Sequence, residues 1–332
     1  MPYFIFILAA IITVIVAVKL STYADIIGER TSLGGMMVGT LLLAGATSLP
    51  EVTTSITAIV VNNPDIAVSN VLGSNLFNLF ILAVLDIYYR RKRLFSQVGT
   101  SHLSTGFMSF ALTGFIFIAI SFPTGYHFMH IGIEMYVLVA FYLVGMKMLF
   151  SAPTGDIHQE AASAVEPTFD TSAISLKKAK YGFALSAFII FISGSFLTIS
   201  GDAIATSSGL SSSFVGTFLI AGATSLPEAV TVIVAIQLAN YHLAIGNILG
   251  SNLFNILILA LADVFYRSGP ILSAVHPITI ISVVAVILLN ILVIGGMILA
   301  QSNRFNGKMY PIPSTIVVST YLLLSYMIFV LS

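Results

Sequence analysis

Two copies of one octapeptide hold the residues best suited to chemistry in this chain. AGATSLPE occurs at residues 44–51 and again at 221–228, each time inside a long apolar stretch. Proline interrupts a helix because it lacks the backbone N–H, and a glutamate in hydrocarbon is costly. A single proline in a membrane helix is more often a kink than a site. The adjacent glutamate and the duplication favour a functional site.

Each proline is expected to divide its helix into two halves. Pro50 leaves the carbonyl of Ala46 without its helical partner, and Pro227 does the same to Ala223. Freed carbonyls must be buried in protein or line a wet cavity. The second half-helix of each copy then starts with a glutamate in its first turn, where the helix dipole favours an ionised carboxylate. The oxygen-bearing side chains at this depth are Thr47, Ser48 and Glu51 in the first copy and Thr224, Ser225 and Glu228 in the second.

The apolar segment after each octapeptide carries further oxygen donors. Three polar residues at i, i+4 and i+8 share one helical face; they are Asn70, Ser74 and Asn78, and then Asn247, Ser251 and Asn255. Gly73 and Gly250 allow close helix approach. Asn75 and Asn252 are expected to point elsewhere and to cap a local break.

Oxygen is the only ligand type that these positions offer, which predicts a site for a hard cation. Ca²⁺ prefers 6–8 oxygen ligands in flexible geometry, whereas Mg²⁺ loses its water reluctantly and fits such a site less well. Na⁺ also takes oxygen ligands and is close to Ca²⁺ in size.

The composition places these motifs in a membrane. Of 332 residues, 58% are hydrophobic and only 8% charged, whereas a soluble domain carries about 25% charged residues. The lipid bilayer is therefore an expected partner. Basic and acidic residues balance at 13 each, so nothing indicates nucleic acid, and the absence of cysteine excludes disulfides and thiolate metal sites. No cofactor is indicated.

An internal repeat organises the chain. Residues 39–90 align with 216–267 at a constant offset of 177, with 31 identities in 52 positions. We expect an all-α integral membrane protein of ten transmembrane helices, near 3–20, 32–61, 65–88, 103–121, 129–150, 180–200, 209–239, 242–266, 273–299 and 311–331. Five helices per half make the two copies cross in opposite directions, which is the inverted repeat of secondary transporters. Helices 2, 3, 7 and 8 are expected to be broken.

The predicted domains follow the repeat. Residues 1–150 form the first five-helix repeat, 151–179 a polar cytoplasmic linker, and 180–332 the second repeat. A monomer is the simplest assembly that the sequence suggests. Near the helix ends, the i,i+4 pairs Asp86–Arg90 and Asp263–Arg267 predict interfacial salt bridges.

Loop charges predict the orientation. With the N-terminus outside, 12 of the 13 basic residues fall on the cytoplasmic side and only Arg267 falls outside. We therefore expect a multi-pass protein of the cell (plasma) membrane with both termini extracellular.

Together, GATSLPE and NxLGSNLFN, duplicated in inverted halves, resemble the alpha repeats of the sodium/calcium exchanger family, of the prokaryotic type without a large regulatory loop. The family belongs to the cation/Ca²⁺ antiporter superfamily. The resemblance implies that Glu51 and Glu228 bind Ca²⁺ and Na⁺ in turn, and that the first and sixth helices slide to alternate access. The implied metal ligands are Glu51, Glu228, Asn78, Asn255, Ser74, Ser251, Thr47, Thr224, Ser48, Ser225 and the carbonyls of Ala44 and Ala221.

Two positions depart from the family pattern. Ala46 and Ala223 replace a common glycine, which alters the backbone fit at the break. Asn255 replaces an Asp that is found in potassium-dependent relatives, so the centre carries two formal negative charges rather than three.

The predicted function is an electrogenic, K⁺-independent antiport of Na⁺ for Ca²⁺, with both ions as substrates. The nearest alternative is H⁺/Ca²⁺ antiport, in which the two glutamates carry protons; proton-coupled relatives more often show a GNATE-like motif. An intramembrane enzyme with two carboxylates as acid and base is a different class, but the GxGD setting of such proteases is missing. A passive channel fits inverted halves less well than alternating access does.

Overall fold

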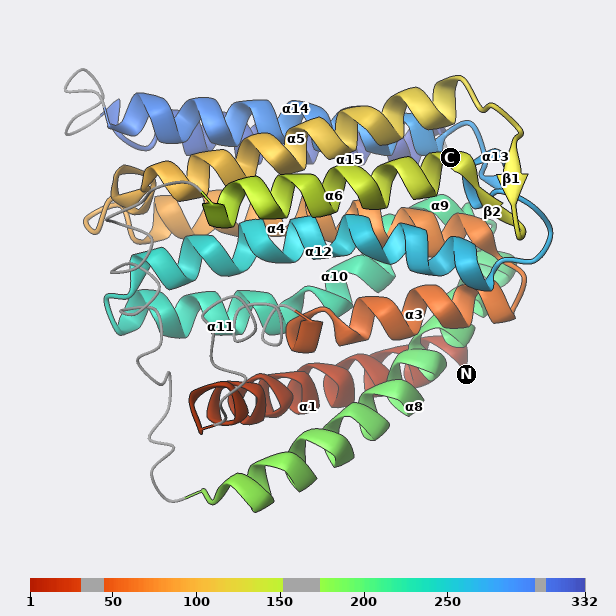
Figure 1. Ribbon diagram of the computed structural model, residues 1–332, viewed down its shortest axis with the longest axis horizontal. Coiled ribbons are helices and arrows are strands. Elements are labelled where there is room, and N and C mark those ends of the chain that lie inside the picture. The colour runs from red at the N-terminus through yellow and green to blue at the C-terminus, as the bar shows by residue number, and fades with distance from the viewer. Residues whose placement is uncertain (31–44, 152–173, 302–308, 332) are drawn as a thin grey trace.

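The structure is a computed structural model that describes residues 1–30, 45–151, 174–301 and 309–331, and nearly all of these are helical (Figure 1). The first half contains α1 (Pro2–Arg30), α3 (Leu49–Val60), α4 (Pro64–Tyr88), α5 (Thr100–Ser121) and α6 (Ile133–Ser151). The second half contains α8 (Leu176–Ser208), α9 (Ser212–Phe214), the π-helix η2 (Val215–Ile220), α10 (Ala221–Thr224), α11 (Leu226–Gln237), α12 (Tyr241–Phe265), α13 (Ile271–Ala274), α14 (Thr279–Ala300) and α15 (Ile312–Leu331).

Short elements complete the described chain. A 3₁₀-helix, η1 (Leu94–Gln97), follows α4, and a two-residue hairpin of β1 (His127–Phe128) and β2 (Ile131–Gly132) joins α5 to α6. The hairpin lies where the sequence predicted the start of a helix at 129. Apart from it, the all-helical prediction is confirmed.

Seven of the described helices are long and apolar enough to cross a membrane, and the bent unit Ser212–Gln237 makes an eighth. Helix α3 is shorter, with 12 residues, and the predicted start of its span at 32–44 lies outside the described residues. The fold is therefore that of a multi-pass membrane protein. The ends marked N and C lie at the same end of the bundle (Figure 1).

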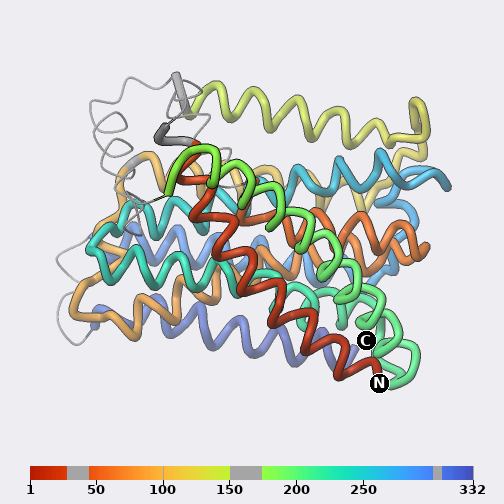
Figure 2. The backbone as a smooth tube through the Cα atoms, turned by 90° about the horizontal axis from the view of Figure 1, so that it is seen from below, coloured from red at the N-terminus to blue at the C-terminus, as the bar shows by residue number. Residues whose placement is uncertain are grey.

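Corresponding helices of the two halves run antiparallel. In Figure 1, α1 runs away from the end that holds the termini, and α8 runs back toward it. Their contacts agree: Thr13 bonds to Ser193, and the ring of Tyr23 lies against Gly182. Figure 2 shows that both helices cross the rest of the bundle obliquely. The same reversal relates α4 to α12.

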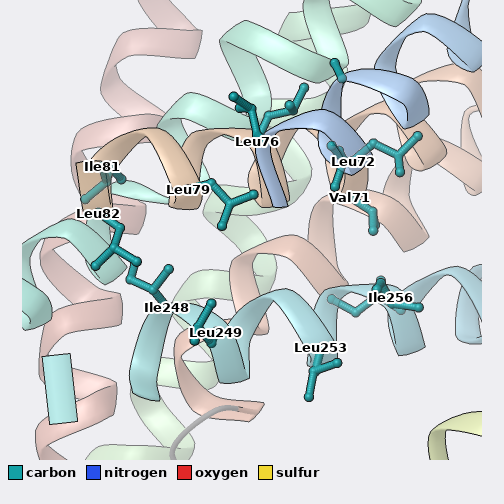
Figure 3. Close-up of a cluster of buried hydrophobic side chains, with 14 of the residues drawn as sticks. Val71, Leu72, Leu76, Leu79, Ile81, Leu82, Ile248, Leu249, Leu253 and Ile256 are labelled. Atoms are coloured by element: carbon teal, nitrogen blue, oxygen red, sulfur yellow. The ribbon is translucent and has the colours of Figure 1, made fainter. Parts of the chain in front are cut away.

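The centre of the bundle is the pair α4 and α12. Buried leucines and isoleucines of both helices form part of the large apolar core, among them Leu72, Leu76, Leu79, Ile248, Leu249, Leu253 and Ile256 (Figure 3). Asparagine caps start both helices: Asn63 accepts the N–H of Ile66, and Asn240 accepts that of Leu243. These two helices form the frame on which the polar residues stand.

Only part of the prediction of broken helices is confirmed. Helix 7 bends by 40° at Ser225, between α10 and α11. In the first half, residues 45–47 are helical and α3 begins after a turn at Ser48. The two breaks match closely, because φ and ψ are −88° and 8° at Ser48 and −87° and −1° at Ser225.

The predicted breaks in helices 3 and 8 are wrong. Both α4 and α12 are continuous helices of 25 residues. No proline interrupts either of them after the first turn, and glycine alone does not end a helix. Gly73 instead lets η2 approach α4, since a Cβ there would collide with the backbone of Thr217.

The packing of the outer helices is unequal. Helix α8 packs along α3 more extensively than its counterpart α1 packs along α11. Hydrogen bonds join α8 to α3 and to the residue before α4: Ser195 to Thr57 at 3.0 Å, Thr198 to the Thr54 carbonyl at 3.2 Å, and Asp202 to Asn63 at 2.7 Å. The Asp202 bond ties the last part of α8 to the cap of α4.

Candidate cation site

Two buried glutamates occupy equivalent helix starts. Glu51 lies in the first turn of α3 and Glu228 in the first turn of α11, each directly after the proline of that turn. Both side chains have no exposed surface, and the Ser74 hydroxyl links their surroundings, since it lies 3.4 Å from Glu51 Oε1 and 3.4 Å from the hydroxyl of Thr224. Two like charges buried close together need a cation or protons between them. The N-terminal dipoles of the two helices stabilise the anionic forms.

Several buried side-chain oxygens, those of the glutamates included, have no hydrogen-bond partner among the described residues. Such oxygens are rare in proteins, and each needs an explanation such as an absent ion or water. Those at the predicted positions are Oε2 of Glu51, both carboxylate oxygens of Glu228, the hydroxyls of Ser48 and Ser225, and the amide oxygens of Asn78 and Asn255. The set pairs across the repeat, as a cation site shared by the two halves requires.

Hydroxyl contacts link each half to the other. Ser74 of α4 lies 3.4 Å from Glu51 Oε1 and 3.4 Å from the hydroxyl of Thr224, in the second octapeptide. The equivalent contact joins Thr47, in the first octapeptide, to Ser251 of α12, also at 3.4 Å. These distances are long for hydroxyl hydrogen bonds, so the contacts between the two halves are weak.

Asn70 and Asn247 lie on the predicted helical face but brace neighbouring helices. Asn70 donates to the hydroxyl of Thr54 at 2.8 Å, and Asn247 donates to that of Thr231 at 2.7 Å. Each therefore ties a glutamate-bearing half-helix to the central helix that follows it.

Of the two predicted carbonyl ligands, Ala44 and Ala221, the structure describes only Ala221. Ala44 lies outside the described residues. The Ala221 carbonyl accepts the N–H of Ser225 at 2.9 Å and the hydroxyl of Thr224 at 3.3 Å. A cation at this carbonyl would displace the hydroxyl rather than the helical bond, since a carbonyl oxygen has two lone pairs.

Sequence reasoning missed the part played by Asn75 and Asn252. Neither caps a break; each bonds across to the opposite central helix, as described below. The repeat showed that Asn75 and Asn252 are equivalent positions, but it did not show which groups they bond to.

The predicted salt bridges of Asp86 and Asp263 are wrong. Asp86 is fully buried and accepts from the Phe95 N–H at 2.9 Å, the Tyr310 hydroxyl at 2.5 Å and the Ser314 hydroxyl at 2.5 Å. Asp263 accepts from the N–H groups of Ile271 at 2.6 Å and Gly132 at 2.7 Å. Both carboxylates are buried in the fold, and they accept hydrogen bonds from backbone N–H or hydroxyl groups instead of pairing with arginine.

Histidine clusters do not offer a competing metal centre in the part of the chain that the structure describes. No group of three or more His, Cys, Asp or Glu side chains there could hold a metal ion. The oxygen set above contains only two carboxylates and is otherwise neutral. It suits hard cations that bind in mixed carboxylate, hydroxyl and amide surroundings.

Antiparallel halves around a buried, oxygen-only centre define a membrane transporter for hard cations. The sodium/calcium exchanger protein family matches residues 1–150 and 178–331. The chain therefore belongs to this family of cation/Ca²⁺ antiporters, which are transporters and not enzymes. This excludes the intramembrane-enzyme alternative.

Two relatives agree with this assignment. The putative antiporter CaxA of Alkalimonas amylolytica is 28% identical over 260 residues, which are 76% of this chain and 77% of the relative. The inner membrane protein YrbG of Escherichia coli (strain K12) is 24% identical over 254 residues, 76% of each chain.

Solved structures share the fold. Native YfkE superposes with a TM-score of 0.65 at 18% identity, covering 98% of this chain and 92% of that one. The sodium-calcium exchanger NCX_Mj, soaked with Na⁺ and Sr²⁺, gives 0.60 at 17% identity, with 97% and 96% covered. The H⁺/Ca²⁺ exchanger CAX gives 0.65 at 14% identity, with 98% and 88% covered. At these identities the likeness concerns the fold and does not select the coupling ion.

Proposed function

We propose that this protein exchanges Na⁺ for Ca²⁺ across the cell membrane by alternating access. One observation carries the proposal: two buried carboxylates are flanked by buried hydroxyl groups from both halves, which touch across the repeat at 3.4 Å. The hydroxyls of Ser48 and Ser225 have no hydrogen-bond partner among the described residues. The carboxylates balance one Ca²⁺. The neutral hydroxyls provide additional positions for Na⁺, which needs oxygen ligands but no further negative charge.

The proposed ligands are the predicted set. Glu51 and Glu228 serve both ions, and Ser74, Ser251, Asn78 and Asn255 line the centre. The hydroxyls of Thr47, Ser48, Thr224 and Ser225, with the carbonyls of Ala44 and Ala221, form the flanking Na⁺ positions. Because the same carboxylates serve both ions, Ca²⁺ and Na⁺ exclude each other, which is the requirement for exchange.

Access alternates when α1 and α8 move against the central helices. The unequal packing of α8 on α3 and α1 on α11 supports this proposal. Because the two halves form an inverted repeat, exchanging the two packings gives a second state that opens to the opposite side. Helix α3 runs toward the end where the termini lie (Figure 1). With both termini extracellular, we infer that this packing closes the outer side, which corresponds to an inward-facing state.

Proton coupling is the rival within the same family. The two glutamates are fully buried without a cationic partner among the described residues, and the fold is shared with an H⁺/Ca²⁺ exchanger. The TSLPE sequence and the flanking hydroxyls favour Na⁺, because a proton carrier needs the carboxylates alone.

Uptake of ⁴⁵Ca²⁺ into proteoliposomes decides between them. Vesicles are loaded with Na⁺, with K⁺, or with an acidic Na⁺-free buffer, and diluted into Ca²⁺ medium. We expect rapid uptake only with internal Na⁺. Uptake driven equally by the acidic, Na⁺-free interior would establish proton coupling and overturn the proposal. Uptake without any counter-ion would indicate a channel.

A further inference from the structure

Four asparagines form a reciprocal arrangement between the two central helices. Asn75 of α4 donates to the backbone carbonyl of Asn252 at 3.2 Å, and Asn252 of α12 donates to that of Asn75 at 3.4 Å. All four members, Asn75, Asn78, Asn252 and Asn255, are completely buried. We call these four residues the amide clasp.

The oxygen atoms of the crossing pair hold the other two amides. Asn78 donates its NH₂ to Asn252 Oδ1 at 2.9 Å, and Asn255 donates its NH₂ to Asn75 Oδ1 at 3.1 Å. Each bond again joins one helix to the other. The amide oxygens of Asn78 and Asn255 are left without a partner among the described residues.

This arrangement determines which end of each amide faces the site. An asparagine amide carries one acceptor end and one donor end, and an untied amide can rotate to present either. An NH₂ group that faced the site would repel a cation and would donate to a glutamate carboxylate. With the NH₂ groups of Asn78 and Asn255 tied to the opposite helix, only oxygen is presented.

The glutamate carboxylates likewise receive no hydrogen bond from these amides. Oε2 of Glu51 and both oxygens of Glu228 accept no hydrogen bond from an amide or from any other described group. Asn78 lies one helical turn after Ser74, whose hydroxyl is 3.4 Å from Glu51 Oε1, so its amide is a candidate donor to the carboxylates, as is that of its counterpart Asn255. Their engagement elsewhere keeps the carboxylates available for the transported ion.

We propose that Asn75 and Asn252 are positioning residues that act through the opposite helix, Asn75 on Asn255 and Asn252 on Asn78, to present amide oxygen to the cation. The proposal rests on the proposed function in that it takes Ca²⁺ as the transported ion. It does not depend on whether Na⁺ or H⁺ is the counter-ion. Each of the two helices donates hydrogen bonds to the other, so the clasp also holds α4 and α12 together while α1 and α8 move.

A double-mutant cycle tests this pairing. Equilibrium ⁴⁵Ca²⁺ binding is measured on purified protein in detergent for the Asn75→Leu, Asn255→Leu and combined variants. Loss of a residue that orients a ligand weakens metal binding by about 10–100-fold. We expect this for Asn75→Leu. The combined variant should bind no more weakly than Asn255→Leu alone, since Asn75 has nothing left to orient.

Two comparisons separate positioning from general packing. Asn75→Asp keeps an acceptor for Asn255, so it should bind Ca²⁺ within about threefold of the wild type or more tightly, unlike Asn75→Leu. Asn290→Leu removes another buried amide, on α14, whose NH₂ bonds to Val286 of its own helix. This control should leave Ca²⁺ binding unchanged.

The outcomes distinguish the two proposals. Wild-type protein that fails to bind Ca²⁺ would remove the proposed function. Normal wild-type binding with additive losses in the Asn75–Asn255 cycle would overturn the positioning role alone. If the leucine variant does not fold, Asn75→Asp still decides, because a loss of tenfold or more there contradicts the proposal. The mirror cycle of Asn252 with Asn78 should repeat the result.

Discussion

The hydroxyl oxygen of Thr57 on α3 lies 3.0 Å from that of Ser195 on α8. Helix α3 carries Glu51, whereas α8 belongs to the outer pair that is proposed to move. If α8 moves as proposed, this contact belongs to one conformational state and breaks in the other.

A disulfide at this contact should stop exchange. The chain has no native cysteine, so Thr57→Cys/Ser195→Cys introduces the only pair. An oxygen separation of 3.0 Å is short enough for sulfur atoms to bond with small adjustments. We expect ⁴⁵Ca²⁺ uptake to fall to background on oxidation and to return with reductant.

The matched control links the two moving helices to each other. Thr13 of α1 and Ser193 of α8 bond at 2.8 Å, so Thr13→Cys/Ser193→Cys should crosslink equally well. If α1 and α8 move as a unit, exchange survives this second disulfide. Full activity of the oxidised Thr57–Ser195 pair would contradict the sliding proposal.

Neutralising either central carboxylate should abolish Ca²⁺ transport. Glu51→Gln and Glu228→Gln keep the side-chain volume but leave one negative charge for a divalent ion in a buried site. We expect ⁴⁵Ca²⁺ flux at background, with unchanged elution in gel filtration. Glu134→Gln serves as control, because Glu134 bonds to Thr124 near the hairpin and takes no part in the site. Near-normal flux in either site variant would refute the two-carboxylate site.

Exchange should move net charge and should not require K⁺. Two carboxylates balance two Na⁺, and the amides of Asn78 and Asn255 add no charge. If more than two Na⁺ occupy the site, the Na⁺-loaded form carries surplus positive charge, and each charge moved is worth about 2.3 kcal/mol per 100 mV. Flux under valinomycin-clamped potentials should therefore depend on voltage. Valinomycin-free vesicles without K⁺ should show full exchange, and either voltage-independent flux or a strict K⁺ requirement would contradict the charge assignment.

Both termini are predicted to be extracellular, and single cysteines can test this. A cysteine at Ala162, in the predicted linker, should react with an impermeant maleimide only in inside-out vesicles. A cysteine at the exposed Met129, in the hairpin between α5 and α6, should react only in intact cells. The opposite pattern would reverse the orientation and make the structure outward-facing.

Asp86 should contribute to stability rather than to ion selectivity. Asp86→Ala leaves the N–H of Phe95 and the hydroxyls of Tyr310 and Ser314 without their acceptor. A hydrogen bond to a charged group contributes about 1.5–3 kcal/mol, so we expect a loss of about 3 kcal/mol or more and a lower unfolding midpoint in detergent. Arg90→Ala should have little effect, whereas a large effect would restore the discarded salt bridge.

The sequence by itself determined the class of the molecule and most of the candidate site. Apolar segments in a bilayer must satisfy their own backbone hydrogen bonds, so their number and length predict helices directly. The offset of 177 predicted matched breaks, and Ser48 and Ser225 adopt nearly the same backbone conformation. Glu51 and Glu228 were identifiable because proline beside glutamate is costly in a membrane unless it serves a purpose.

Only the tertiary structure decided how the polar residues pair. Asp86 was assigned to Arg90, four residues away, yet it bonds to Tyr310, 224 positions away. Asn75 was read as a local cap, yet its partners stand on α12. Helical periodicity reports which residues share a face of one helix, but a hydrogen bond between helices depends on their separation and relative rotation. Those quantities arise from packing across the whole bundle, so the amide clasp became visible only in the folded chain.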